Sequence, residues 1–174
     1  MIEEKLIYDG YVKIYDVKKE NNGKVEEYTK VFLRGASAGI VINEEGKMAL
    51  VSQYRPIIGM RTLEVPAGTL DKGISPKEII IEELEEECGI CKEDILSISD
   101  NPILTYKIIE NMSDGEMHIF LINVKSKDTK PKEDDDVDEV NFYTLDEIES
   151  LISKRIITDP KTLISYYLYK DMIQ

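Results

Sequence analysis

Cysteine and histidine are scarce in this sequence, and the few present are poorly placed for zinc or redox chemistry. The only cysteines, Cys88 and Cys91, have a C-x-x-C spacing, and His118 is the single histidine. A redox pair needs a helix N-terminus, where the dipole lowers a thiol pKa, whereas this pair ends an expected helix beside acidic residues. Zinc would need two more soft ligands, and only His118 remains. We expect reduced, packed cysteines and a structural His118, which alternates with apolar neighbours on a strand.

Basic residues are also few. The 174 residues include 22 Lys and Arg against 35 Asp and Glu, a formal net charge of -13. Such a surface disfavours binding to nucleic acid or to anionic membranes. If the protein handles a phosphorylated substrate, it needs a cation between its own negative charge and that of the substrate.

Long apolar runs are missing. No stretch approaches the roughly 18 apolar residues of a transmembrane helix. The first residues, MIEEKLIYDG, do not have the pattern of a signal peptide. We therefore expect no membrane association and a cytoplasmic location.

Strand and turn signals dominate the first part of the chain, and helices end it. Asn21-Asn22-Gly23 and Glu45-Gly46 each separate two strand-like segments, as in β-hairpins. Further strand signals lie between residues 103 and 143, and two helices are expected at the C-terminus, the second after Asp159-Pro160. No domain boundary is evident. This order indicates a single domain of the α+β class, residues 1–174, with a mostly antiparallel or mixed sheet.

The clearest helix follows the loop PAGTLDKG. Ser75 is a good N-cap, Pro76 suits the first helical position, and Glu78 completes a capping box. Gly89 stands where a left-handed C-terminal residue belongs. An apolar stripe that would pack on a sheet is formed by Ile80, Leu84 and Cys88.

Negative charge is crowded on this helix. Like charges three and four residues apart repel, yet no Lys or Arg occurs from Glu78 to Cys91. Glu83, Glu86 and Glu87 share one helix face and would form an oxygen-rich site for a hard cation such as Mg²⁺. The alternative is a solvated acidic face, which usually intersperses both signs of charge.

The stretch from Gly68 to Ile90 resembles the Nudix box, G-x5-E-x7-R-E-U-x-E-E-x-G-U, where U is a bulky apolar residue. The positions that match after Gly68 are Glu83, Leu84, Glu86, Glu87, Gly89 and Ile90. Two positions depart from the box, because Ile74 replaces its first glutamate and Glu82 replaces its arginine. In the family these two residues help to tie the loop to the catalytic helix.

The flanking segments are similar to those of ADP-ribose pyrophosphatases. ALVSQYR and LEVPAG precede the box, and VNFYTLDEI and TDPKTLISYYLY follow it. The resemblance implies the Nudix fold, an α/β/α sandwich with a mixed sheet and a catalytic loop-helix. It also implies a homodimer, in which a β-hairpin region of about residues 1–35 mediates dimerisation.

The resemblance implies metal-dependent hydrolysis of a nucleoside diphosphate linked to another moiety, with ADP-ribose giving AMP and ribose 5-phosphate. Glu83 and Glu86 would be catalytic, and Mg²⁺ or Mn²⁺ would be held by Ala67, Glu83, Glu86 and Glu87. The substrate, a nucleoside diphosphate sugar, would meet Arg55, Arg61 and Glu64. Because a guanidinium matches two phosphate oxygens, the two arginines are the candidates to hold phosphate. Ordinary surface charge is their alternative.

A general base is often supplied in this branch by a carboxylate before the last strand. Asp136 aligns best by counting back from VNFY, with Glu133, Asp134, Asp135 and Asp138 nearby and Glu116 as a second candidate. A solvated acidic loop is the alternative.

The two box departures leave a second function open. The sequence is compatible with an active hydrolase and with a weakly active or non-catalytic Nudix domain that binds a nucleotide ligand as a sensor or partner module. The retained glutamates favour the enzyme. A third interpretation, an acidic interaction protein, leaves the glycine loop and the capped helix unexplained.

Overall fold

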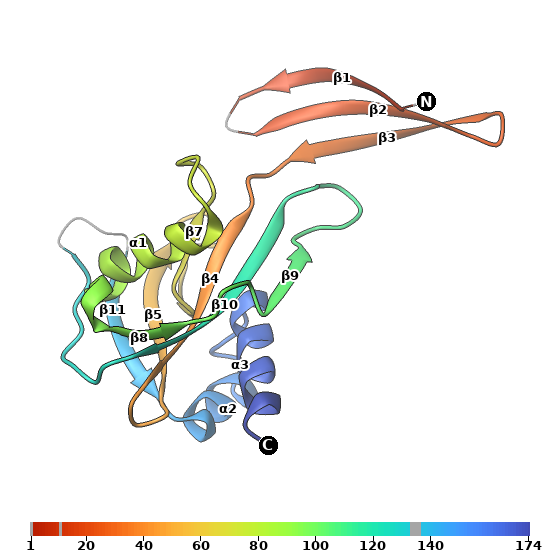
Figure 1. Cartoon of the computed structure of the whole chain (residues 1–174). Coiled ribbons are helices and arrows are strands. Elements are labelled where there is room, and N and C mark those ends of the chain that lie inside the picture. Colours follow the sequence, from red (N-terminus) through yellow and green to blue (C-terminus); the bar gives the residue numbers. More distant parts are fainter. Residues whose placement is uncertain (1, 11, 133–136) are drawn as a thin grey trace.

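The computed structural model describes residues 2–10, 12–132 and 137–174. These residues form two sheets and three α-helices, and the first strand and the last helix lie in different parts of the molecule (Figure 1). The strands are β1 (Ile2–Asp9), β2 (Lys13–Asn21), β3 (Lys24–Phe32), β4 (Ala36–Asn43), β5 (Met48–Arg55), β6 (Met60–Glu64), β7 (Ala67–Thr69), β8 (Ile95–Ile98), β9 (Leu104–Lys107), β10 (Glu116–Val124) and β11 (Val137–Tyr143). The helices are α1 (Pro76–Cys88), the short 3-10 helix η1 (Lys92–Asp94), α2 (Leu145–Ser153) and α3 (Pro160–Met172).

The main sheet has eight strands in the order β11-β5-β4-β10-β8, with β6, β7 and β9 paired to β5, β4 and β10. Strand β10 runs parallel to β4, while the other pairings are antiparallel. The sheet is therefore mixed, as the sequence predicted.

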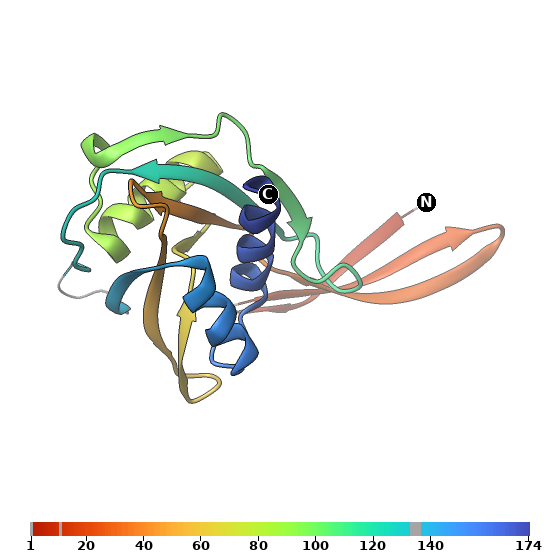
Figure 2. The ribbon, with the colours of Figure 1, turned by 90° about the horizontal axis from the view of Figure 1, so that it is seen from below.

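Side chains alternate between the two faces of this sheet, and each face has its own core. One face buries Val41, Val51 and Phe120 under α1, which contributes Ile80 and Leu84. The opposite face is covered by α2 and α3 (Figures 1 and 2), and its buried side chains include Ile40, Leu50, Ile119, Ile148 and Tyr166. Since successive residues of a strand point to opposite faces, one strand supplies both cores. The predicted α+β class and α/β/α sandwich are confirmed.

The predicted hairpins are present. Asn21 pairs with Lys24, and Asn22 and Gly23 have φ values of 51° and 77°, the left-handed pair that suits a tight hairpin turn. The turn at Gly46 joins β4 to β5. The sequence did not predict that β1, β2 and β3 form a sheet of their own, which extends away from the main body (Figures 1 and 2).

Two other expectations concern the cysteines and the membrane. Cys88, the last residue of α1, is buried in the core between α1 and the sheet, whereas Cys91 is only partly buried, and both cysteines are free. No helix in the described part of the chain is long and apolar enough to cross a membrane. The cytoplasmic location stays a prediction.

Candidate active site

Helix α1 begins and ends where the sequence indicated. Ser75 accepts a hydrogen bond from the Glu78 amide while the Glu78 side chain accepts from the Ser75 amide, and Gly89 adopts φ 65° beyond the last turn. With its apolar side packed on the sheet, the helix places Glu82, Glu83 and Glu87 against the segment that precedes it. Glu87 is buried on this side of the helix and is only 6% exposed.

Strand β7 lies against this acidic side of α1. The Ala67 amide donates a 3.0 Å hydrogen bond to Glu87 Oε2. Gly68 faces Glu83 so closely that a Cβ atom on residue 68 would lie 2.2 Å from Glu83 Oε1. The missing side chain at position 68 thus allows the Glu83 carboxylate to approach this closely. The structure brings together Ala67, Glu83 and Glu87, three of the four residues predicted to hold a metal.

Glu86, the fourth, lies near a residue that the sequence analysis missed. Lys72 Nζ is 2.8 Å from Glu82 Oε2 and 3.9 Å from Glu86 Oε2. Its hydrogen bond to Glu82 raises the pKa of Lys72, with a smaller contribution from the charge of Glu86. The negative charge of the helix is therefore partly compensated by a lysine from the loop, which a search of the helix alone could not find.

The donors on α1 suit a hard divalent cation, because all are carboxylate oxygens. Their present arrangement does not complete such a site. Within the described residues, no three His, Cys, Asp or Glu side chains are grouped so that they could hold a metal ion. The metal ligands therefore stay a prediction.

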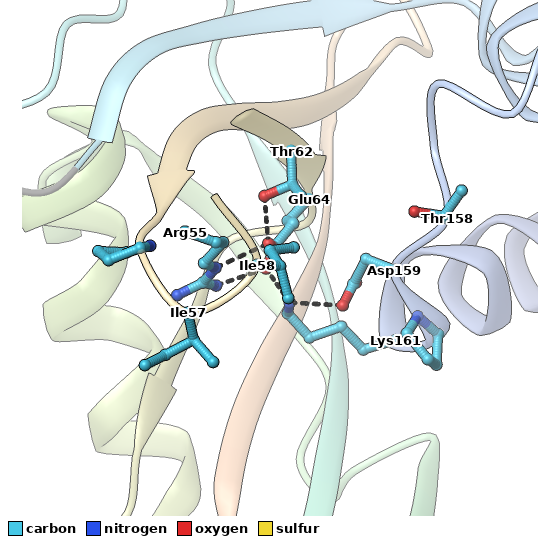
Figure 3. Close-up of a pocket in the computed structure, with 10 residues that line it drawn as sticks. Arg55, Ile57, Ile58, Thr62, Glu64, Thr158, Asp159 and Lys161 are labelled. Carbon is cyan, nitrogen blue, oxygen red and sulfur yellow. Dashed lines mark hydrogen bonds and ion pairs between the residues drawn. The ribbon is translucent and has the colours of Figure 1, made fainter. Parts of the chain in front are cut away.

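A cavity of about 550 Å³ opens beside this region, between the β5–β6 turn and the start of α3 (Figure 3). Arg55 lies in its wall, and its Nε and Nη2 atoms donate to the two oxygens of Glu64 at 2.8 and 2.5 Å. Thr62 Oγ1 donates to Glu64 at 2.6 Å. The negative charge of Glu87 also contributes to raising the pKa of Arg55, after the larger effect of the Glu64 hydrogen bond. A charge on α1 therefore acts on a residue in the wall of the cavity.

Glu64 has a second cationic partner, Lys161 of α3, which in turn lies 3.2 Å from Asp159 Oδ1. Burial alone would raise the pKa of Glu64, but the hydrogen bonds and charges of Arg55 and Lys161 lower it to about 2. Lys161 was not predicted from the sequence. Lys161 is 97 positions from Glu64 in the sequence. The one sequence feature that marked its surroundings was Asp159-Pro160, which indicated the start of a helix.

The comparison with protein families agrees with this geometry. The sequence model of the NUDIX domain matches residues 33–164, most of the chain. The chain belongs to the Nudix family. The acidic helix, the glycine loop and the cavity all lie inside the matched range.

Three relatives match most of the Nudix chain. An ADP-ribose pyrophosphatase of Bacillus subtilis (strain 168) is 29% identical, covering 99% of this chain and 94% of its own length. A methanol dehydrogenase activator of Bacillus methanolicus is 32% identical, covering 94% of this chain and 88% of its own length. A CMP-5'-(N-acetyl-N-hydroxy-3-aminopropyl)phosphonate hydrolase of Streptomyces rubellomurinus (strain ATCC 31215) is 26% identical over 89% of this chain and 74% of its own length.

The remaining predicted site residues of this Nudix domain are dispersed. Arg61, on β6, is paired with Asp138 of β11 rather than lining the cavity. Asp136 lies outside the described residues, as do Glu133, Asp134 and Asp135. Glu116, the second candidate for the base, is paired with Lys107 at 2.7 Å.

Proposed function

We propose that this chain hydrolyses a nucleoside diphosphate linked to another moiety, and that ADP-ribose, cleaved to AMP and ribose 5-phosphate, is its substrate. The observation that carries the proposal is the packing of Glu83 and Glu87 against the loop residues Gly68 and Ala67, with Arg55 nearby. The Bacillus subtilis relative named ADP-ribose pyrophosphatase supports the choice of substrate.

In this proposal the Ala67 carbonyl and the carboxylates of Glu83, Glu86 and Glu87 hold a divalent cation, Mg²⁺ or Mn²⁺. When bound, such a cation neutralises charge on the diphosphate and lowers the pKa of the attacking water. Arg55 holds a phosphate oxygen through the edge of its guanidinium that faces away from Glu64. A carboxylate takes the proton of the water as it attacks phosphorus; the candidates are Asp136, which lies outside the described residues, and then Glu116.

The test is release of AMP from ADP-ribose by the full chain at millimolar Mg²⁺. Glu86→Gln removes one predicted ligand and should lower turnover at least about a hundredfold, beyond the 10- to 100-fold typical of residues that only support a ligand. Glu85→Gln is the matched control, because Glu85 lies on the same helix but pairs with Lys132. Absence of turnover with any nucleoside diphosphate sugar, with either Mg²⁺ or Mn²⁺, would contradict the proposal.

A second candidate is a nucleotide-binding module that acts on a partner protein. The relative named methanol dehydrogenase activator favours it, as do the box departures at Ile74 and Glu82. Calorimetry with Mg²⁺ and ADP-ribose distinguishes the two: binding without turnover indicates the module, and binding with turnover indicates the enzyme.

We also propose that the region of about residues 1–35 forms a homodimer interface. Its three-stranded sheet leaves many apolar side chains exposed, and such patches mark interaction surfaces. They are Ile2, Leu6, Ile7, Tyr8, Val25, Tyr28 and Phe32. Sedimentation velocity should give a dimer for the full chain and a monomer for the double variant Val25→Glu, Tyr28→Glu. Leu96→Glu, an equally exposed apolar residue on β8, should remain dimeric; a monomeric wild type would refute this interface.

A further inference from the structure

The carboxylate of Glu64 has no free acceptor site in this structure. It is 3% exposed, and its oxygens accept from Arg55 twice, from Thr62 and from Lys161. A carboxylate offers about four lone-pair positions, so these four donors saturate it. A ligand could bind Glu64 only by breaking one of these bonds, which indicates that Glu64 acts through its partners.

Lys161 is held in place by the first turn of α3. Asp159 caps the helix, accepting hydrogen bonds from the Thr162 amide at 2.9 Å and the Thr162 hydroxyl at 2.6 Å. The same hydroxyl accepts from the Val65 amide at 2.9 Å. Val65 directly follows Glu64, so the start of α3 is attached to β6 through both a backbone group and the buried ion pair.

Arg55, Glu64, Lys161 and Asp159 carry two positive and two negative charges and form three linked ion pairs. The charge of Asp159 is stabilised by the helix N-terminus that it caps and by the nearby Lys161. Lys161, only 9% exposed, also neutralises Glu64. As a result, Glu64 orients Arg55 without cancelling its positive charge completely.

Arg55 is arranged to use that charge on a ligand. Its Nε and Nη2 edge faces Glu64 (Figure 3), and among the described residues no hydrogen bond engages Nη1. Its side chain is 43% exposed at the cavity. A guanidinium with one edge anchored and the other free is well suited to a phosphate oxygen.

We propose that Lys161 is a positioning residue for phosphate binding: by sharing Glu64, it keeps the guanidinium of Arg55 both oriented and positively charged toward a nucleoside diphosphate. This inference rests on the proposed function for the class of ligand. Lys161 itself need not touch the ligand.

The experiment is calorimetry with ADP as the probe, on the full chain and on Arg55→Met, Lys161→Met and the double variant. Each single change should weaken ADP binding about tenfold, which corresponds to the lower end of the free energy contributed by a hydrogen bond to a charged group. The double variant should bind about as weakly as Arg55→Met alone, because Lys161 acts through Arg55. If the wild type turns over ADP-ribose, Lys161→Met should raise KM by a similar factor with kcat little changed.

Two conservative variants separate charge from structure. Lys161→Arg keeps the charge and should retain most of the affinity for ADP, whereas Lys161→Gln keeps a hydrogen-bond donor without the charge and should lose it. If Lys161→Met does not fold, these two variants test the proposal in its place. Lys170→Met is the control, because Lys170 is on the same helix but pairs with Glu149; its ADP affinity should equal that of the wild type.

The outcomes are distinct for the two proposals. Equal ADP affinity in wild type and Lys161→Gln, additive losses in the double variant, or no ADP binding by the wild type would overturn the positioning role. ADP binding with the expected losses but without turnover would instead overturn only the proposed hydrolysis.

Discussion

Lys72 Nζ lies 2.8 Å from Glu82 Oε2, joining the loop after β7 to helix α1. Glu82 stands where the Nudix box has arginine, and Ile74, where the box has glutamate, lies only two residues after Lys72. The connection between loop and helix is therefore kept with its charges reversed: the cation comes from the loop and the anion from the helix.

Exchanging these charges tests the connection. Glu82→Arg brings two cations together, and Lys72→Glu places an acid among Glu82, Glu83 and Glu86. Each should speed hydrogen exchange in residues 70–74, while the double variant restores protection. Because both side chains are more than 40% exposed, global stability should change by less than about 1 kcal/mol. The control is Lys77→Glu, whose partner Asp100 lies outside the loop; unchanged exchange in both single variants would refute the role of the pair.

Gly68→Ala should impair the active site with little loss of stability. The added Cβ would lie within 2.3 Å of three Glu83 side-chain atoms, and a flexible carboxylate can move away at small cost. Its displacement removes a predicted metal ligand, so turnover and Mg²⁺ affinity should fall together. In a Glu83→Ala background the same substitution should have no further effect. A larger drop in melting temperature there than in the wild type would contradict this account.

Divalent metal should stabilise the folded protein. A cation present at about ten times its Kd contributes about 1.4 kcal/mol, which raises the melting temperature by roughly 3–6 °C in a protein of this size. Glu83→Gln, Glu86→Gln and Glu87→Gln should each reduce this shift in Mg²⁺ titrations followed by calorimetry. Glu85→Gln should retain it. The predicted ligand set is wrong if all four variants respond as the wild type does.

Acid should weaken the fold through Glu64. The folded-state pKa of Glu64, about 2, is below its ordinary value of 4.5, so its contribution to stability is full above pH 4.5 and is lost as the pH falls toward 2. The difference corresponds to about 3 kcal/mol at neutral pH. Urea unfolding at several pH values should therefore show a shallower acid dependence for Glu64→Gln than for the wild type.

The same variant should be less stable at neutral pH, since removing one partner from a buried ion pair costs about 3–5 kcal/mol. Glu85→Gln, which alters an exposed pair, is the control and should change neither property. An acid dependence identical in wild type and Glu64→Gln would show that other carboxylates control acid unfolding.

Local sequence patterns predicted the elements that depend on neighbouring residues. The capping box of Ser75 and Glu78 and the left-handed Gly89 set the limits of α1 as expected. Asn22 and Gly23 formed the predicted turn. These features depend on hydrogen bonds and backbone angles within a few residues, and so a short sequence window contains the information.

The sequence by itself determined the class of the fold, the acidic face of α1 and the glycine loop beside it. Only the tertiary structure decided which charges meet: Lys72 with Glu82, Arg61 with Asp138, and Lys161 with Glu64. Such pairs join residues from different elements, and no periodicity along the chain encodes their distance in space. The physical reason is that a local hydrogen bond is specified by neighbouring residues, whereas a salt bridge between β6 and α3 exists only after the sheet and helices have packed.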